Sequence, residues 1–356
     1  MNLDIPFSAV SSRQFAEETG AHWLGVEAAH DFVPPKVTIF GDDEIVFPFE
    51  NGIPAAGVLQ ASNLRVVTPH GWLIDSAGRT LADHSWYGMH HVDEWKRKTI
   101  KADVVELEGR VCVLASDWAS NNYGHFLMDV MPRIDLVERA GGRLADMTWV
   151  LAPYKNNNFM SMLAELGVSE SQCVWSDHPT CYHCQEVVAP TFPGARRTMP
   201  VWAADFLASR LVTRPGAGRR LYIPRTTRRR VSNEDDVITF LSAHGFEIFD
   251  PGASDENPRQ AFAEADIVIG GGGAGLTDIV FSRPGAVLLE LVPTDHVYPY
   301  YLNAAAARGV HFGAIVCKSF GERETGAWGP SPFDCVADVK AVHDALNWAL
   351  ELLGSS

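Results

Sequence analysis

The sequence lacks long apolar runs and an excess of positive charge, and both absences exclude classes of protein. No stretch approaches the roughly 18 uninterrupted apolar residues that a membrane-spanning helix needs. Acidic residues outnumber basic residues by 44 to 29, which gives a formal net charge of −15. Because nucleic acids and anionic membranes are bound by basic surfaces, we expect neither partner. A local basic pocket is still compatible with this balance.

The sequence also has little that would indicate secretion or a metal site. The first residues lack a basic segment followed by an apolar one, so they do not predict a signal peptide. Six cysteines among 356 residues then indicate reduced thiols in a cytosolic protein, with peripheral docking at the inner membrane still open. Cys181 and Cys184 form the segment CYHC, but a structural zinc site usually needs a second such pair. We therefore expect no metal and interpret CYHC as a turn with two small buried residues.

A chain of this length is too long for one ordinary core, and the sequence predicts two domains. We expect an N-terminal, acceptor-side domain over residues 1–212 that is rich in strands between residues 32 and 120. The segment 213–220 is the best linker candidate, because proline, glycine and arginine cluster there. Residues 213–333 alternate strand and helix patterns, which is typical of a parallel, Rossmann-like sheet. A last helix within residues 334–356 packs back on the protein.

Four consecutive glycines at positions 270–273 follow the strand pattern ADIVI and precede a short helix pattern over residues 275–282. Glycines let a phosphate approach the unpaired backbone amides at the start of a helix. The loop lacks the GK[ST] ending of a Walker motif, and it does not follow a first strand as a dinucleotide fingerprint does. The spacing alone leaves a phosphate site and a tight structural turn as open alternatives.

Four of six consecutive positions are arginine directly after the strand pattern LYIP and before a predicted helix with Ser232 or Asn233 as its N-cap. These are Arg225, Arg228, Arg229 and Arg230. Guanidinium groups bind phosphate in a bidentate manner, and a helix N-terminus adds to the positive field. The alternative is a solvated loop with surface ion pairs to Glu234 and its neighbours. We favour anion binding, because both phosphate candidates follow strands of one sheet.

A helix predicted over residues 123–140, kinked at Pro132, carries His125, Asp129 and Arg133 at intervals of four. Four residues advance an α-helix by about 400°, so the three side chains project from nearly one face. A carboxylate at this spacing can orient the imidazole and raise its basicity, which suits a general base. By spacing alone, a stripe of paired charges at the edge of a cleft or on the surface is the favoured interpretation.

Together these segments resemble glycosyltransferase family 61, which is also catalogued as a domain of unknown function. NYGHFLMDVMPRI is similar to the family's segment with asparagine, an aromatic residue, histidine and aspartate. LYIPRTTRRRVSNED is similar to its arginine segment that ends in asparagine and glutamate. AFAEADIVIGGGGAGLTDIVFSRPGAVLLEL is similar to its GAGL segment. The likeness covers residues 110–295, and we expect a bacterial, cytosolic member.

The resemblance implies an α/β fold of the GT-B type, in which two Rossmann-like domains face a cleft. It also implies inverting, metal-independent transfer of a sugar to a hydroxyl group in polysaccharide or glycoconjugate synthesis. The donor would be a nucleotide sugar carrying uridine diphosphate, and the acceptor a glycan, a lipid-linked molecule or a small molecule. No cofactor besides this co-substrate is expected. The alternative is a non-catalytic protein that binds a nucleotide sugar or glycan at a degenerate site.

The resemblance also implies roles for individual residues. His125, oriented by Asp129, would deprotonate the acceptor, and Asp129 itself is the close alternative for the base. Asn122, Tyr123 and Arg133 would line the acceptor side. The expected donor-binding residues are Arg225, Arg230, Asn233, Glu234, Gly272, Gly273, Ala274, Gly275, Leu276, Thr277 and Glu290.

Within this donor set, Arg225 and Arg230 would bind the diphosphate and Glu290 the ribose hydroxyls. Two positions depart from the family's pattern: Gly272 stands where the family commonly has histidine, and Asp278 where it commonly has asparagine. A lost imidazole removes a phosphate or sugar contact, and an added carboxylate near a diphosphate is unfavourable unless it faces the sugar or solvent.

Overall fold

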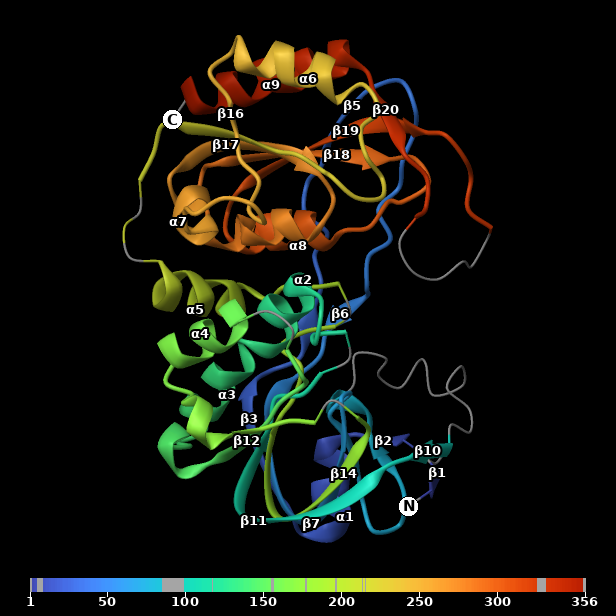
Figure 1. The fold of residues 1–356 in the computed structure, drawn as a ribbon, viewed down its shortest axis with the longest axis vertical. Helices are drawn as coiled ribbons and strands as arrows, with labels where there is room; N and C mark the ends of the chain where they lie inside the picture. Colours follow the sequence, from blue (N-terminus) through green and yellow to red (C-terminus); the bar gives the residue numbers. More distant parts are fainter. Residues whose placement is uncertain are drawn as a thin grey trace. The chain divides into compact units, whose positions relative to one another are not determined.

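The structure is a computed structural model that describes most of the chain, namely residues 2–4, 9–84, 99–116, 118–154, 157–176, 178–195, 197–212, 214, 216–324 and 331–354. The fold is mixed α/β (Figure 1). Contacts divide the chain into two compact units, Met1–Phe32 with Gly52–Arg196, and Val33–Asn51 with Arg197–Ser356. The division thus falls before the segment 213–220, and residues 33–51 join the second unit.

The second unit contains the elements β5 (Thr38–Phe40), α5 (Val201–Leu211), β15 (Arg219–Ile223), α6 (Glu234–Ser242), β16 (Glu247–Ile248), α7 (Pro258–Ala263), β17 (Ala265–Gly271), the 3-10 helix η6 (Ala274–Phe281), β18 (Val287–Pro293), α8 (Tyr300–Ala307), β19 (His311–Ser319), β20 (Cys335–Ala337) and α9 (Val339–Gly354). Its five central strands are parallel and lie in the order β16-β15-β17-β18-β19. In chain order this is 2-1-3-4-5, a doubly wound sheet. Such sheets bind ligands at the carboxyl ends of the first and third strands, where the strand order reverses.

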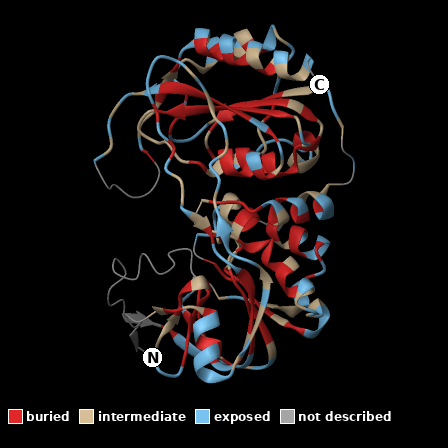
Figure 2. Cartoon of the chain, turned by 180° about the vertical axis from the view of Figure 1, so that it is seen from behind, coloured by how far each residue is buried: buried red, intermediate tan, exposed pale blue. Residues whose placement is uncertain are grey.

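Helices cover both faces of this parallel sheet. Helices α6 and α9 lie on one face, and α7, α8 and η6 lie on the other (Figure 1). The strands carry continuous apolar runs, as expected for a sheet that is buried on both sides. Every residue of β18 is buried, and Figure 2 shows the strands of this sheet as buried and the outer faces of its helices as exposed. The core of the second unit therefore fixes the strand ends that carry the loops.

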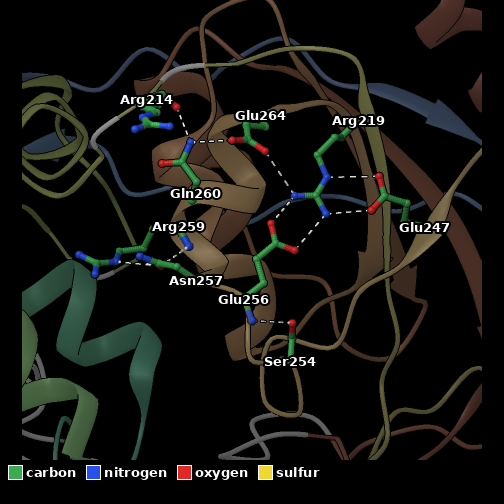
Figure 3. Close-up of polar contacts among 9 residues, drawn as sticks. All are labelled: Arg214, Arg219, Glu247, Ser254, Glu256, Asn257, Arg259, Gln260 and Glu264. Carbon is green, nitrogen blue, oxygen red and sulfur yellow. Dashed lines mark hydrogen bonds and ion pairs between the residues drawn. The ribbon is translucent and has the colours of Figure 1, made fainter.

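One arginine ties three carboxylates together at the amino ends of these strands. Arg219, the first residue of β15, donates to Glu247 at 2.8 Å, to Glu256 at 2.5 Å and to Glu264 at 3.5 Å (Figure 3). The hydrogen bond to Glu256 is the largest cause that raises the pKa of Arg219. Because the ligand edge of a doubly wound sheet is the opposite one, we interpret this network as structural.

The first unit contains β1 (Asn2–Asp4), β2 (Ala9–Val10), α1 (Ser12–Thr19), β3 (His22–Glu27), β4 (His30–Asp31), β6 (Gly52–Ile53), β7 (Ala56–Thr68), β8 (Trp72–Ile74), β9 (Thr80–Leu81), β10 (Thr99–Lys101), β11 (Asp103–Val113), α2 (Tyr123–His125), a π-helical turn (Phe126–Val130), α3 (Arg133–Arg139), β12 (Thr148–Val150), α4 (Asn157–Glu165), β13 (Cys173–Val174) and β14 (Thr180–Pro190). Its large sheet runs β13-β12-β11-β14-β7-β8-β9-β2. The first four strands are parallel, and β14 pairs antiparallel with β7. The helical segment that begins at Tyr123 follows β11, one of the parallel strands.

The segment CYHC lies in strand β14 and not in a turn, which corrects the interpretation from the sequence. Cys181 and Cys184 are both buried, and their odd spacing points them to opposite faces of the sheet. They accordingly belong to different apolar clusters. Two side chains on opposite faces cannot bind one metal ion together. Within the described ranges, no three His, Cys, Asp or Glu side chains gather as a candidate metal site.

None of the described helices is both long enough and apolar enough to cross a membrane.

Candidate functional site

The predicted His–Asp pair is present at the start of the helical segment after β11. The Asn122 side chain accepts hydrogen bonds from the backbone amides of Gly124 at 3.0 Å and His125 at 3.4 Å, so Asn122 is the expected N-cap. Nδ1 of His125 lies 2.7 Å from Oδ2 of Asp129. Because a carboxylate accepts the Nδ1 proton, Nε2 is the basic nitrogen of the neutral ring. This is the geometry of an oriented general base.

Aromatic side chains pack beside this pair. The Tyr123 ring lies 6.0 Å from the ring of Phe159, and the Phe126 ring stacks on Phe159 at 4.1 Å. Phe126 and Phe159 are buried, so this packing anchors the first turns of the helical segment to α4. The acceptor-side role of Asn122 and Tyr123 stays a prediction.

Arg133 does not share the face of His125, which corrects the predicted stripe. Its side chain is 0% exposed. Its Nη2 donates to the carbonyl oxygens of Val113 at 2.8 Å and Pro190 at 2.7 Å. The π-helical turn, in which Met131 bonds back five residues, shifts the phase of the helix before Arg133. A fully buried guanidinium cannot line an acceptor site, and Arg133 instead joins the ends of β11 and β14.

The donor candidates of the second unit lie where its strand order reverses. The segment 225–230, which we call the arginine loop, follows β15, and the segment 270–273, which we call the glycine loop, lies at the end of β17. A Cβ atom added to Gly273 would lie 1.7 Å from Nη1 of Arg225, whereas one added to Gly271 would be 3.4 Å from Cδ of the same side chain. A side chain at position 273 would therefore displace the guanidinium group, and Arg225 lies at the glycine loop as predicted.

Arg229 is the second arginine of this site. Arg228 and Arg229 have φ values of 37° and 56°, a left-handed conformation that only a few per cent of non-glycine residues adopt. The side chain of Arg229 is buried and donates to the carbonyl oxygen of Gly272 at 3.1 Å. Burial, followed by the charge of Arg225, lowers the pKa of Arg229 to about 10, so it stays charged at neutral pH.

Arg230, which was expected to bind the diphosphate, instead forms an ion pair with Asp334. It donates to Oδ2 of Asp334 from Nη2 at 2.7 Å and from Nε at 3.0 Å, and its side chain is 60% exposed. Its charge is thus neutralised by a surface ion pair. Arg229 takes the position beside the glycine loop that the sequence prediction gave to Arg230, and no sequence signal distinguishes the two.

Asn233 and Glu234 hold the arginine loop in place. Nδ2 of Asn233 donates to the carbonyl oxygen of Ala337 in β20 at 2.8 Å, and its Oδ1 accepts from the backbone amide of Ala337 at 3.0 Å. Oε1 of Glu234 accepts from the hydroxyl of Tyr222 at 2.8 Å and from the backbone amide of Arg225 at 3.3 Å. These contacts show that both residues position the arginine loop, and their direct contact with the donor stays a prediction.

The end of the glycine loop is buried more deeply than the sequence suggested. Ala274 is exposed and Gly275 partly exposed, and their contact with the donor stays a prediction. Leu276, Thr277 and Asp278 are buried in η6. The side chains of Leu276 and Thr277 therefore pack inside the unit, which corrects their assignment as donor contacts. The carboxyl group of Asp278 does not face solvent.

Glu290 lies in β18, beside the glycine loop. A Cβ atom at Gly272 would lie 2.6 Å from Oε1 of Glu290, so the glycine leaves room for this carboxyl group. Glu290 is 5% exposed, and its Oε2 is buried without a hydrogen-bond partner among the described residues. Burial raises its pKa to about 8, although the charge of Arg229 opposes this. Glu290 is therefore mostly protonated at neutral pH. Its contact with a ribose stays a prediction.

Sequence reasoning missed His296, which lies in the loop after β18. Nη1 of Arg229 lies 2.8 Å from its Nε2. Burial and then the charges of Arg229, Arg323, Arg225 and Arg197 lower the pKa of His296 to about 3, so the ring is neutral. These four arginines, which we call the arginine cluster, make this part of the second unit electropositive in a protein of net charge −15.

Comparison with known proteins agrees with this geometry. No curated protein sequence matches the chain. Residues 123–289 match the family Glycosyltransferase 61. The matched segment includes the His125–Asp129 pair, the arginine loop and the glycine loop, and it ends one residue before Glu290. Residues 123–289 are thus a glycosyltransferase family 61 segment, and this match supports a glycosyltransferase function.

Proposed function

We propose that this glycosyltransferase moves a sugar from a nucleotide sugar to a hydroxyl acceptor, with inversion at the anomeric carbon and without an essential metal ion. A GT-B architecture, a uridine diphosphate donor and a role in bacterial polysaccharide or glycoconjugate synthesis belong to the same proposal. The observation that carries it is the pair of arginines, Arg225 and Arg229, held against the glycine loop of a doubly wound sheet.

The two arginines suit a diphosphate leaving group. Negative charge grows on the diphosphate as its bond to the sugar breaks, and prepositioned positive groups stabilise that charge most effectively. Guanidinium groups match phosphate oxygens in shape and keep their charge at neutral pH. Ala274, an exposed residue, begins η6 directly after the glycine loop. These groups supply the charge that a divalent cation provides in metal-dependent enzymes.

The His125–Asp129 pair suits the other half of the reaction. Nε2 of His125 takes the proton from the acceptor hydroxyl, and the oxygen attacks the anomeric carbon. The bond from that carbon to the diphosphate oxygen breaks, and its electron pair leaves on the diphosphate. Asp129 holds the ring through Nδ1 and stabilises the imidazolium that forms. A single displacement of this kind inverts the anomeric configuration. Asp129 as the base itself is the alternative within the proposal.

A binding screen followed by product analysis tests the proposal. A nucleoside diphosphate that binds the folded chain raises its apparent melting temperature, so UDP, GDP, ADP and their sugars are compared in buffer with EDTA. Nuclear magnetic resonance then gives the anomeric configuration of the product formed on candidate acceptors. Binding in EDTA and an inverted product support the proposal. Retention of configuration contradicts the single displacement, and no binding at millimolar nucleotide contradicts the donor site.

A non-catalytic nucleotide-sugar or glycan-binding protein is the competing function. Gly272 favours this function, because the family commonly has histidine at this position and glycine contributes no imidazole to the site. Tight binding of a nucleotide sugar, with neither transfer nor hydrolysis for any acceptor, would establish this competing function. The geometry of a base in the first unit, with Nδ1 of His125 2.7 Å from Oδ2 of Asp129, favours the enzyme.

A further inference from the structure

The loop between β18 and α8 carries a histidine whose hydrogen bonding is incomplete. An arginine guanidinium has no acceptor, so at 2.8 Å Arg229 must donate and Nε2 of His296 must accept. The neutral ring then carries its proton on Nδ1. Nδ1 is buried, and no described residue accepts a hydrogen bond from it. A buried donor without an acceptor is costly, which indicates that an acceptor binds there.

The same neighbourhood holds other buried polar atoms without partners. Among the described residues these include Nε of Arg229, Nε of Arg197 and Oε2 of Glu290. The arginine atoms are donors, and Glu290 is a donor as well while it is protonated. Arg229 and Glu290 are 8% and 5% exposed, so ordinary solvent does not satisfy them. A group of donors with no acceptor fits an oxygen-rich anion.

Tyr298 brings two further arginines of the cluster to this histidine. The guanidinium of Arg197 lies over the Tyr298 ring, 4.2 Å from its centroid. Nη1 of Arg323 donates to the Tyr298 hydroxyl at 3.4 Å, and the ring of His296 meets Tyr298 edge-on at 4.6 Å. Arg197 also has a left-handed φ of 66°, a strained conformation that is typical of functional sites. The loop after β18 therefore brings Arg197 and Arg323 to the histidine that contacts Arg229 beside the glycine loop.

We infer that His296 contacts the diphosphate of the donor directly, donating from Nδ1 to a phosphate oxygen inside the cluster of Arg197, Arg225, Arg229 and Arg323. The inference rests on the proposed function for the identity of the donor. The number of cationic groups favours a ligand with two phosphate groups over one with a single phosphate. Asp295 is the carboxylate of this loop, and its oxygens accept from the hydroxyls of Ser319 and Ser331. The histidine is thus a binding residue for the donor, in addition to the arginines.

Two substitutions separate the nitrogen atoms of the ring. His296→Asn places an amide donor near the position of Nδ1, whereas His296→Gln extends to the position of Nε2 and loses the Nδ1 donor. His311→Gln, at an exposed histidine of the same unit, is the matched control. The probes are UDP, inorganic pyrophosphate, inorganic phosphate and uridine, measured by titration calorimetry. Melting curves verify that each variant is folded.

We expect the wild type to bind pyrophosphate more tightly than phosphate. His296→Gln should weaken UDP and pyrophosphate by about 10-fold or more, the value of one hydrogen bond to a charged group. His296→Asn should stay within about threefold of the wild type, and His311→Gln should not change binding. Unchanged UDP affinity in folded His296→Gln would overturn the inference and leave the proposed function intact. Pyrophosphate binding without any nucleotide-sugar binding would support the inference and contradict the proposed donor.

A spectroscopic measurement covers the case in which a variant does not fold. In wild-type protein with ¹⁵N-labelled histidine, His296 should show a neutral ring with its proton on Nδ1. Adding pyrophosphate should shift the Nδ1 signal while leaving that of His311 unchanged. An Nδ1 signal that does not respond to saturating pyrophosphate contradicts the contact.

Discussion

A methyl group at Gly273 would lie 1.7 Å from Nη1 of Arg225, so the guanidinium group fills the position that a larger side chain would need. Gly273 has extended backbone, with φ near −173°, so the glycine makes room for the guanidinium group and does not relieve backbone strain. The relationship links the two loops at the point where the strand order reverses. It also explains why an arginine loop and a glycine loop occur together in one sheet.

Gly273→Ala should displace Arg225 and weaken binding of UDP by about 10-fold, because the charge-assisted contact to phosphate is lost. Gly271→Ala is the control, since its Cβ would make ordinary contact with Arg225 at 3.4 Å. Titration calorimetry with UDP measures both. Equal affinities for the two variants would mean that Arg225 does not bind the ligand from this position.

Arg229→Gln and Arg230→Gln should differ strongly, although the two arginines are adjacent. Loss of the buried Arg229 should reduce UDP affinity by about 10-fold or more, because it removes a charge that is only weakly screened. Arg230 is exposed and paired with Asp334, so its loss should change affinity by less than about threefold. The sequence alone favoured Arg230, and the reverse order of effects would restore that assignment.

His125→Ala should abolish transfer while leaving UDP affinity nearly unchanged. General-base catalysis contributes about 10²- to 10⁴-fold, so turnover should fall by at least about 100-fold. Asp129→Asn should lower turnover as well, because the amide no longer holds the Nδ1 proton of His125. Initial rates and calorimetry on the same preparations test this. Full turnover by His125→Ala would exclude His125 as the base.

Binding of UDP should weaken as the pH rises through about 8, where Glu290 loses its proton beside the anion site. Glu290→Gln, which keeps the shape without the charge, should remove that dependence.

The free energy of unfolding should also decrease as the pH rises. Glu290 has an ordinary pKa of 4.5 and a folded pKa of about 8, so the folded state binds one more proton between these values. The free energy of unfolding therefore decreases as the pH rises across this window, and the decrease should be smaller in Glu290→Gln. Urea titrations between pH 5 and 9 measure the difference.

Arg133→Leu should lower the free energy of unfolding by about 3 kcal/mol or more, because several buried carbonyl groups lose their donor. Arg139→Ala removes an arginine of the same helix that pairs with Glu27 at the surface, and it should cost about 1 kcal/mol or less. Urea unfolding measures both variants. A loss of activity in Arg133→Leu without a loss of stability would instead favour a role in the acceptor site.

The sequence by itself determined the parts of this protein that depend on local pattern. The parallel strand–helix alternation of the second unit, the N-cap at Asn122 and the His125–Asp129 pair all follow from short-range spacing. Such features are local because one or two helical turns, or one strand and its loop, contain every residue involved.

Only the tertiary structure decided which charged side chains enter the site. A π-helical turn moved Arg133 into the core, and a left-handed turn directed Arg229 to the glycine loop while Arg230 paired with Asp334 at the surface. His296 reaches Arg229 across 67 residues of sequence. Burial and long-range contact set these positions and the raised pKa of Glu290, and neither quantity is present in a local sequence pattern.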